Sequence, residues 1–505
     1  MKKLKKMSCS CIALAVGLTL FAGCSGGKSK TSSENGAVEI KVFSDSAPNE
    51  TGDPAWFEHI EKERGIKLSI EAPPATSYTE RLQIMLTSGD YPDLVCFRTN
   101  GTEFVDAAEG GVLIPVNQYL KGKKNLEKYT YEQSWDAMKV KQDDDIYGIP
   151  RSTMMRQDGF YIRADWLRNL GIEIPKDRKL SLDQFYDILY KFTYNDPDGN
   201  GKNDTYGIAS YNDAAKGMAI TVEETFKLFG WQKADGKYKY MDPKYSRTDD
   251  TYKKALKFNA KLFKERLIDP DAPTITTYVN STERFKRGVV GVIRAFPAYI
   301  DGYIKEMRKI DKNADICMVT CIIDEEGSSK AGTPYGTGFF GLHGITVNSK
   351  HPDKIVDLLD WMLSDEEWPT TMYGMENVCY KTENGEKKFV PDVYQGFGKS
   401  VVRRNTDTDF YMPTDATLVS TDDIKAALNE CMDNAVFSLD RGFTPSIATK
   451  PLFIDQQTNL IKTTTKILLG EEDVSAYDKA LDKWYENGGE EYVKEMNEYI
   501  KRVEK

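Results

Sequence analysis

The sequence predicts an α/β protein organised in two lobes. Between residues 38 and 97, segments with a two-residue apolar period alternate with segments of helical pattern, as in a parallel sheet with crossover helices. The chain has 505 residues, which is too many for one compact core and suits two lobes of about 200 residues or more. Its 40% hydrophobic and 11% aromatic content is typical of a globular protein.

Each predicted element has its own local signal. Apolar residues alternate in strands at 38–42 and 66–70, and a continuous apolar run predicts a buried strand at 94–97. Helical patterns occupy 56–64, which Gly65 ends, and 78–87. Farther along, helical spacing predicts helices at 181–192, with a capping box from Ser181 and Gln184, and at 355–363. Helices in about the last forty residues close the domain.

Residues 1–23 have the pattern of a secretory signal. Four lysines precede an apolar run at 11–22 that is too short to span a bilayer. Cys24 follows Leu-Phe-Ala-Gly, which resembles a bacterial lipobox with Phe21 in place of the usual Leu. We therefore expect acylation of Cys24, a flexible tether at 24–37 and a lipid-anchored protein on the outer face of the membrane. The alternative is a signal cut elsewhere, with Cys24 as a bystander.

Charge and cysteine content exclude several classes of protein. The net charge is −10 for the whole chain, and an acidic surface argues against nucleic acid, which needs a basic footprint. Apart from Cys24, the mature chain holds five cysteines, so they cannot all pair. Cys317 and Cys321 lie four residues apart in one predicted strand, too far for a disulfide. We interpret the cysteines as small core residues.

One local motif predicts a structural Ca²⁺ site. Oxygen side chains occupy alternate positions in a turning segment that is rich in glycine, and a backbone carbonyl completes the set, as hard cations require. The predicted ligands are Asp196, Asp198, Asn200, Lys202 (through its carbonyl) and Asp204. Gly207 stands where an EF-hand has its bidentate Glu, so a sensor EF-hand is rejected. The alternative is a solvated turn without metal.

Signals for catalysis are weak. The chain has three histidines, none in a metal-binding spacing; outside the predicted signal junction at 23–27 it lacks a Gly-x-Ser-x-Gly sequence, and it lacks a Walker loop. Residues 336–341 match a dinucleotide fingerprint in letters, but a predicted strand follows where a helix is needed. We therefore predict no catalytic residue and no enzyme. Paired carboxylates leave a secreted glycosidase or lyase as the alternative function.

Several segments, in this order, resemble the extracellular solute-binding proteins of ABC carbohydrate importers (family 1), in the lipoprotein branch common in Gram-positive bacteria. The resemblance covers nearly all of residues 38–505 and rests on four stretches: 86–94, 147–150, 163–175 and 468–484. It implies a two-lobed periplasmic-binding-protein-like fold of type II with the ligand cleft between lobes. Lobe one would comprise 38–152 plus 322–370, and lobe two 153–321 plus 371–505. The loop at 196–204 is similar to the Ca²⁺ loop of alginate-oligosaccharide-binding members.

The resemblance also implies cleft contacts at strand ends. Two tryptophans beside polar turns add candidate platforms for sugar rings, whose apolar faces pack on indole. The predicted ligand-binding residues are Trp56, Arg98, Asn100, Arg151, Trp231, Arg294, Phe296 and Tyr335. For each, the alternative is a structural role in a core or a surface ion pair.

We thus expect a monomeric receptor that captures an oligosaccharide by hinge closure and delivers it to ABC permease subunits. The arginines raise the hypothesis of an acidic sugar, although guanidinium groups also hydrogen-bond neutral hydroxyls. A peptide-binding or signalling lipoprotein is the third alternative.

Overall fold

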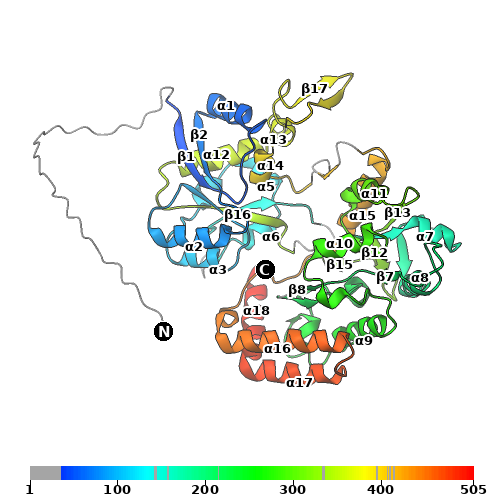
Figure 1. Ribbon diagram of the computed structural model, residues 1–505. Coiled ribbons are helices and arrows are strands. Elements are labelled where there is room, and N and C mark those ends of the chain that lie inside the picture. The colour runs from blue at the N-terminus through cyan, green and yellow to red at the C-terminus, as the bar shows by residue number, and fades with distance from the viewer. Residues whose placement is uncertain are drawn as a thin grey trace, which may run out of the picture.

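The computed structural model describes residues 36–140, 145–155, 158–173, 175–213, 215–332, 336–393, 396–406, 408, 411–412 and 416–504. The described residues form two bodies, each built on its own main sheet (Figure 1). The predicted signal and Cys24 lie outside the described residues, as does Tyr335. Among the described helices, none has both the length and the apolar character to cross a membrane.

The first sheet has the strand order β2-β1-β3-β16-β4. Its strands are β1 (Val38–Phe43), β2 (Ile66–Glu71), β3 (Leu94–Phe97), β4 (Ile149–Ser152) and β16 (Phe339–Ile345). β1 pairs in parallel with β2 and β3, which confirms the prediction from the alternating segments. β16 runs antiparallel to β3 and β4, with a register shift between Phe339 and Leu342.

Helices cover both faces of the first sheet. On one face, α1 (Asp53–Arg64) and α12 (Pro352–Met362) bury Trp56, Ile60 and Leu359 against the strands. On the other face, α2 (Tyr78–Ser88) and α3 (Thr102–Glu109) pack through Leu82 and Phe104. Shorter helices complete this body: α4 (Asn117–Leu120), α5 (Lys124–Lys128), α6 (Glu132–Asp136), α13 (Trp368–Tyr373) and α14 (Phe397–Val401).

The second sheet has the order β13-β5-β12-β7. Its strands are β5 (Gly159–Arg163), β7 (Tyr206–Ile208), β12 (Val290–Ala295) and β13 (Ile316–Val319). Helices again lie on both faces: α7 (Ala164–Asn169), α8 (Leu182–Tyr194) and α9 (Thr251–Lys264) on one side, and α10 (Tyr278–Lys286), α11 (Ile300–Met307) and α15 (Thr421–Asn434) on the other. Ser181 and Gln184 form the predicted capping box of α8.

The last helices, α16 (Pro451–Leu468), α17 (Ser475–Trp484) and α18 (Glu490–Val503), add to the core of the second body, as predicted for closing helices. Paired short strands decorate both bodies: β6 (Lys179–Ser181) with β14 (Cys321–Ile323), β8 (Asn212–Asp213) with β9 (Gly217–Met218), β10 (Gln232–Lys233) with β11 (Tyr240–Met241), β15 (Ala331–Gly332) with β19 (Ala435–Val436), and β17 (Tyr380–Glu383) with β18 (Glu386–Phe389). The strand predicted around Cys317 and Cys321 is split at Thr320.

The chain crosses between the bodies three times, after β4, before β16 and after α14. Residues beside α6 contact all three crossings. The Tyr131 hydroxyl accepts from the Met155 amide (3.1 Å) and donates to the Asn405 carbonyl (3.1 Å). Ser134 donates to the Thr337 carbonyl (2.6 Å). The three connections are therefore held together at one place.

The predicted lobe boundaries stay a prediction, and two contacts bear on where they lie. β14 pairs with β6 of the second body, although residues 322 and 323 fall in the predicted lobe one. Met372 and Phe397 belong to the core of the first sheet, although they fall in the predicted lobe two.

Candidate ligand-binding site

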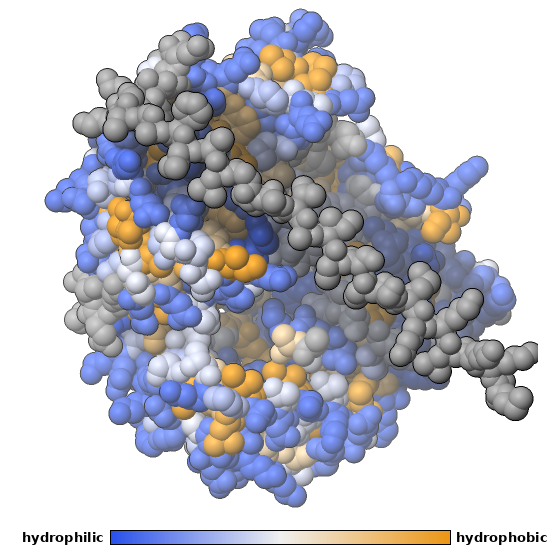
Figure 2. Space-filling model, turned by 60° about the vertical axis from the view of Figure 1, so that its left-hand side comes forward, coloured by the Kyte–Doolittle hydropathy of each residue, from blue (hydrophilic) through white to orange (hydrophobic). Residues whose placement is uncertain are grey.

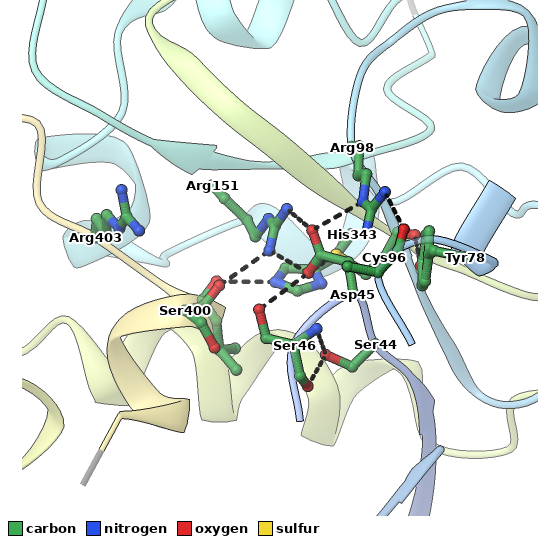
Figure 3. A network of polar contacts seen from close by, with 12 residues as sticks. Ser44, Asp45, Ser46, Tyr78, Cys96, Arg98, Arg151, His343, Ser400 and Arg403 are labelled. Carbon is green, nitrogen blue, oxygen red and sulfur yellow. Dashed lines mark hydrogen bonds and ion pairs between the residues drawn. The ribbon is translucent and has the colours of Figure 1, made fainter. Parts of the chain in front are cut away.

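A polar network lies where the first sheet meets the crossings (Figure 3). Asp45 follows β1, Arg98 follows β3, Arg151 belongs to β4 and His343 to β16. Parallel β1 and β3 bring the residues after their carboxyl ends to the same edge, which places Asp45 near Arg98. The neighbouring antiparallel strands add Arg151 and His343.

Arg151 and Asp45 form the centre of this network. The two terminal nitrogens of Arg151 each donate to one carboxylate oxygen of Asp45 at 2.9 Å, in a bidentate arrangement. Nη1 of Arg151 also donates to the Ser400 carbonyl (3.0 Å). Only 2% of the Arg151 side chain is exposed. Arg151 was predicted to contact ligand, but its guanidinium is directed at protein groups.

The surroundings fix the charges of this network. Burial favours the neutral carboxyl of Asp45, yet the hydrogen bonds and charge of Arg151 outweigh burial and hold its pKa below the usual value. Burial raises the pKa of the Cys96 thiol, which lies 3.2 Å from Asp45, to about 12. Burial and then the Arg151 charge lower the pKa of His343 to about 4. At neutral pH the charges are thus those of Asp45 and the arginines.

Arg98 stands at the exposed side of the network. Its guanidinium carbon lies 4.5 Å from the Tyr78 ring centroid, and Nη1 donates to the Ala75 carbonyl (3.2 Å). Nε lies 3.9 Å from Asp45, and 39% of the side chain is exposed. Arg98 is therefore held in place on one side and accessible on the other.

The sequence analysis missed Phe340 and Arg403. The guanidinium carbon of Arg403 lies 3.7 Å from the Phe340 ring centroid, and that of Arg151 lies 4.5 Å from the same ring. Both Phe340 and Arg403 are half-buried. Phe340 lies in β16 and Arg403 in the crossing after α14. The only sequence signal was the Arg403-Arg404 pair, which also has an ordinary surface interpretation.

The second body presents polar and aromatic residues in β12, directly after it and at the start of α10. Arg294 pairs with Glu224 at 3.0 Å, and Tyr278 donates to the Arg294 carbonyl (3.0 Å). Phe296 is buried and packs edge-on against Tyr299. Tyr278 and Tyr299 were not predicted, although 39% and 58% of them are exposed. These two rings, and not Phe296, offer surface for stacking.

The predicted tryptophan platforms are wrong. Trp56 is fully buried among the helices of the first body, where it contacts Phe57 and Phe397. Trp231 is 3% exposed and packs with Tyr245 and Tyr492. The polar residues next to them in the sequence form turns at the ends of buried segments. Such neighbours do not prevent the indole rings from packing into the core.

Asn100 takes a bridging position instead. Its amide nitrogen lies 3.4 Å from the Ala137 carbonyl and 3.5 Å from the Gly442 carbonyl of the second body. The nearby Arg441 forms an ion pair with Asp136. These contacts join the bodies beside the crossings. The space-filling view shows a recess between the upper and lower parts of the molecule (Figure 2).

The predicted metal loop gathers its carboxylates around Asn200. The Asn200 amide nitrogen donates to Asp198 (2.8 Å) and Asp204 (3.1 Å), and Asp196 accepts from the backbone of Asn200 and Gly201. Partial desolvation and the neighbouring Asp196 and Asp204 raise the pKa of Asp198. Within the described part of the chain, no group of three or more His, Cys, Asp or Glu side chains is arranged to hold a metal ion.

Comparison with known proteins identifies the family. The model of the bacterial extracellular solute-binding proteins matches residues 46–367, which is more than half of the chain. The chain belongs to this family. The predicted resemblance is thereby confirmed.

Two curated relatives of this solute-binding protein match almost end to end. Lipoprotein LipO of Bacillus subtilis (strain 168) is 26% identical, with 96% of this chain and 97% of LipO covered. The polygalacturonan/rhamnogalacturonan-binding protein YtcQ of the same organism is 24% identical, with 97% and 98% covered.

Solved structures show the same fold. The Streptococcus pneumoniae ABC-transporter substrate-binding protein FusA in complex with kestose has a TM-score of 0.64 at 17% identity, over 92% of this chain and 99% of that one. Alginate-binding protein AlgQ2 without calcium ion has a TM-score of 0.63 at 18% identity, over 92% and 98%. The two-lobed solute-binding fold predicted from the sequence is confirmed.

Gly341 tests the packing of the central pair. A Cβ at this position would lie 2.1 Å from Nη2 of Arg151. We expect Gly341→Ala to lower the free energy of unfolding by about 3 kcal/mol, because it displaces a buried charge from its partner. Denaturant unfolding measures this. Gly302→Ala in α11 is the control, since its Cβ meets no atom within 4 Å. Equal stability of wild type and Gly341→Ala would contradict the packing described.

His343 predicts a pH dependence of stability. Its pKa is lowered from 6.5 to about 4 in the folded state, so the unfolded chain binds the proton more readily between these values. This contribution to stability is fully present above pH 6.5 and falls by about 3 kcal/mol as the pH drops to 4. In His343→Gln, whose amide can still donate to the Val401 carbonyl, denaturant unfolding should show a smaller loss over that range. An identical pH profile for the two proteins would rule out this assignment.

Proposed function

We propose that this chain is the substrate-binding component of an ABC importer and captures an oligosaccharide between its two bodies. The carrying observation is that both bodies present polar and aromatic side chains. In the first they are Arg98 after β3, Phe340 in β16 and Arg403 after α14; in the second they are Tyr278 at the start of α10, Arg294 in β12 and Tyr299 after β12. Sugars need planar hydrogen-bond donors for hydroxyls and aromatic rings for their apolar faces. The names of FusA and YtcQ, both sugar-binding relatives, support the same class of ligand.

The proposed mechanism is hinge closure. A ligand that contacts both bodies binds the closed arrangement better than the open one and shifts the population toward it. Three crossings held together beside Tyr131 suit a rotation of the bodies. The closed form then presents a surface made of both bodies to the permease subunits. No group in this mechanism forms or breaks a covalent bond.

The N-terminal segment completes the proposal. Acylated Cys24 anchors the protein to the outer face of the cytoplasmic membrane, and the tether keeps a monomeric receptor close to its permease. The relative LipO is named a lipoprotein, and the match covers 96% of this chain and 97% of LipO, which supports this anchor. Mass spectrometry of the membrane-extracted protein tests it, because an N-terminal peptide that begins elsewhere or carries no acyl group refutes the anchor.

A structural Ca²⁺ ion at residues 196–204 is the finer part of the proposal. The residue types suit a hard cation, because three carboxylates and the Lys202 carbonyl belong to one loop, although the described side chains hydrogen-bond Asn200 and are not arranged as metal ligands. The side chains of Asp196, Asp198, Asn200 and Asp204 would hold the ion, which would offset the repulsion among the carboxylates. Two related solved structures, AlgQ2 without calcium ion and an EF-hand mutant of FusA, support such a site.

Ligand binding tests the proposed function. Isothermal titration calorimetry with a panel of oligosaccharides should find binders, and small-angle scattering should show a smaller radius of gyration with ligand. Tyr299→Ala should weaken binding about ten-fold, because stacking surface is lost. Tyr190→Ala, an exposed tyrosine on α8 (46% exposed), is the matched control. Shortened saccharides after long incubation would instead reveal the alternative enzyme, and the absence of any binder would refute the proposal.

Metal removal tests the Ca²⁺ site. EDTA should lower the melting temperature and Ca²⁺ should restore it, since an ion bound only by the folded state adds about 2.7 kcal/mol at a hundred-fold excess over Kd. Asp204→Asn keeps the shape of the side chain and removes one charge, so its melting temperature should respond less to EDTA. If wild-type protein melts unchanged after verified metal removal, the loop is a plain turn.

A further inference from the structure

The end of the second sheet that faces away from the crossings holds a cavity of about 840 Å³. β5 begins after a crossing at Gly159 and ends at Arg163, which pairs with Ile316 at the start of antiparallel β13. Figure 1 shows α7, which follows β5 here, on the side of the second body away from the first sheet. Arg294 and Tyr299 of the proposed sugar site belong to the opposite end of β12, beside Gly159. The cavity is therefore separate from that site.

Charged side chains line this cavity, and most of them already have partners. The cations are Arg163, Arg168, Lys286, Arg287, Arg308 and Lys312. The acids are Asp165, Asp198, Asp311 and Asp315. Outside the surroundings of Arg163, the partnered groups are Arg168 and Arg308 with Asp315 (3.0 and 3.9 Å), Lys286 with Glu283 (3.0 Å) and Asp198 with the Asn200 amide (2.8 Å). Arg287 and Lys312 are exposed and form no ion pair within the described part of the chain.

Arg163 supplies the innermost donor of the cavity. Its side chain is 4% exposed, and Nε and Nη2 donate to the two carboxylate oxygens of Asp165 at 2.8 and 2.5 Å. Nη2 also lies 3.3 Å from Asp311, and the guanidinium carbon lies 4.7 Å from the Trp166 ring centroid. Nη1, in contrast, makes no hydrogen bond with a described residue and is not fully buried. Two N–H donors of a firmly held cation are therefore unused.

The neighbouring segments place the two exposed cations around this guanidinium. Gly288 lines the cavity with a left-handed φ of +72°, and a Cβ on it would lie 3.1 Å from Nη1 of Arg163. Arg287 directly precedes Gly288 in the chain. On the other side, Asp311 contacts Nη2 and is directly followed by Lys312. Three donors without a described acceptor thus reach one cavity from three elements: the end of β5, the turn after α10 and the turn after α11.

We propose that this cavity is a second ligand site, which binds a phosphate monoester through Nη1 of Arg163 and the side chains of Arg287 and Lys312. A phosphate monoester carries a charge of about −1.5 to −2 at neutral pH and has three free oxygens, so it can accept hydrogen bonds from three directions. A carboxylate has two oxygens in one plane. The cavity is much larger than a phosphate group, which leaves room for the alcohol part of the ester. The proposal goes beyond the capture of an oligosaccharide and does not depend on it.

Calorimetry with the full chain tests the class of ligand. The compounds share a glycerol unit and differ in charge and oxygens: glycerol 3-phosphate, the diester glycerophosphoglycerol, glycerate and glycerol. We expect glycerol 3-phosphate to bind at least ten-fold tighter than the diester or glycerate, and less tightly as salt is raised, since salt screens charges. Glycerol should not bind. Equal or tighter binding of the diester or glycerate overturns the assignment to a monoester, and a lack of binding of glycerol 3-phosphate overturns the site.

Variants locate the contact. Arg287→Gln and Lys312→Gln should each weaken binding of glycerol 3-phosphate about ten-fold, because each removes a charge-assisted hydrogen bond. The matched controls are cations outside the cavity lining: Arg81→Gln (53% exposed) and Lys309→Gln (70% exposed). Melting temperatures check that each variant is folded. Affinities that stay at the wild-type value in both cavity variants overturn the location of the site. Oligosaccharide affinity should be unchanged in these variants, so this test and that of the proposed function can fail separately.

The part played by Arg163 needs a direct view. Arg163→Gln would leave Asp165 as a buried charge without its cation and would test folding more than binding. Crystals of the protein soaked in tungstate, an oxyanion located by its anomalous scattering, should show an ion within about 3 Å of Nη1. An ion bound only elsewhere overturns the role of Arg163.

Discussion

The bidentate pair of Arg151 and Asp45 is the interaction on which the site depends. Two charges are taken out of water here, which is costly unless both are fully hydrogen-bonded. Arg151 meets this requirement with two bonds to Asp45 and one to the Ser400 carbonyl. Its contacts reach β1, β4, α14 and, through the close approach of Gly341, β16. Such a pair adds little net stability, but it fixes how four segments meet.

The arrangement of charge follows from this pair. Both carboxylate oxygens of Asp45 accept hydrogen bonds from Arg151. Asp45 therefore compensates little of the charge of Arg98, whose Nε is 3.9 Å away. In the second body the order is reversed, since Arg294 is the group that is satisfied, by Glu224. Arg98 follows β3 and Arg294 lies within β12, and their side chains are similarly exposed (39% and 34%). Only the folded structure shows that Arg294 has a carboxylate partner at 3.0 Å.

Several elements of both bodies could be predicted from the sequence because each has a strong local signal. Alternation at 38–42 and 66–70, the capping box at Ser181, and the apolar stripe at 355–363 specify local structure without help from distant residues. The site was harder. Phe340 in β16 and Arg403 after α14 are 63 residues apart in the chain, and no local pattern marks their contact. Trp56 and Trp231 failed for the opposite reason, because polar neighbours along the chain say little about what packs above a ring.

The three connections that are held together beside α6 have a mechanical consequence. Tyr131 and Ser134 touch residues 155, 337 and 405, one from each connecting strand of chain, while β4 and β16 leave the first sheet as hydrogen-bonded neighbours. In the proposed closure, one body would therefore turn against the other about a point near Tyr131, and a saccharide held by both bodies would be contacted along the path of that turn.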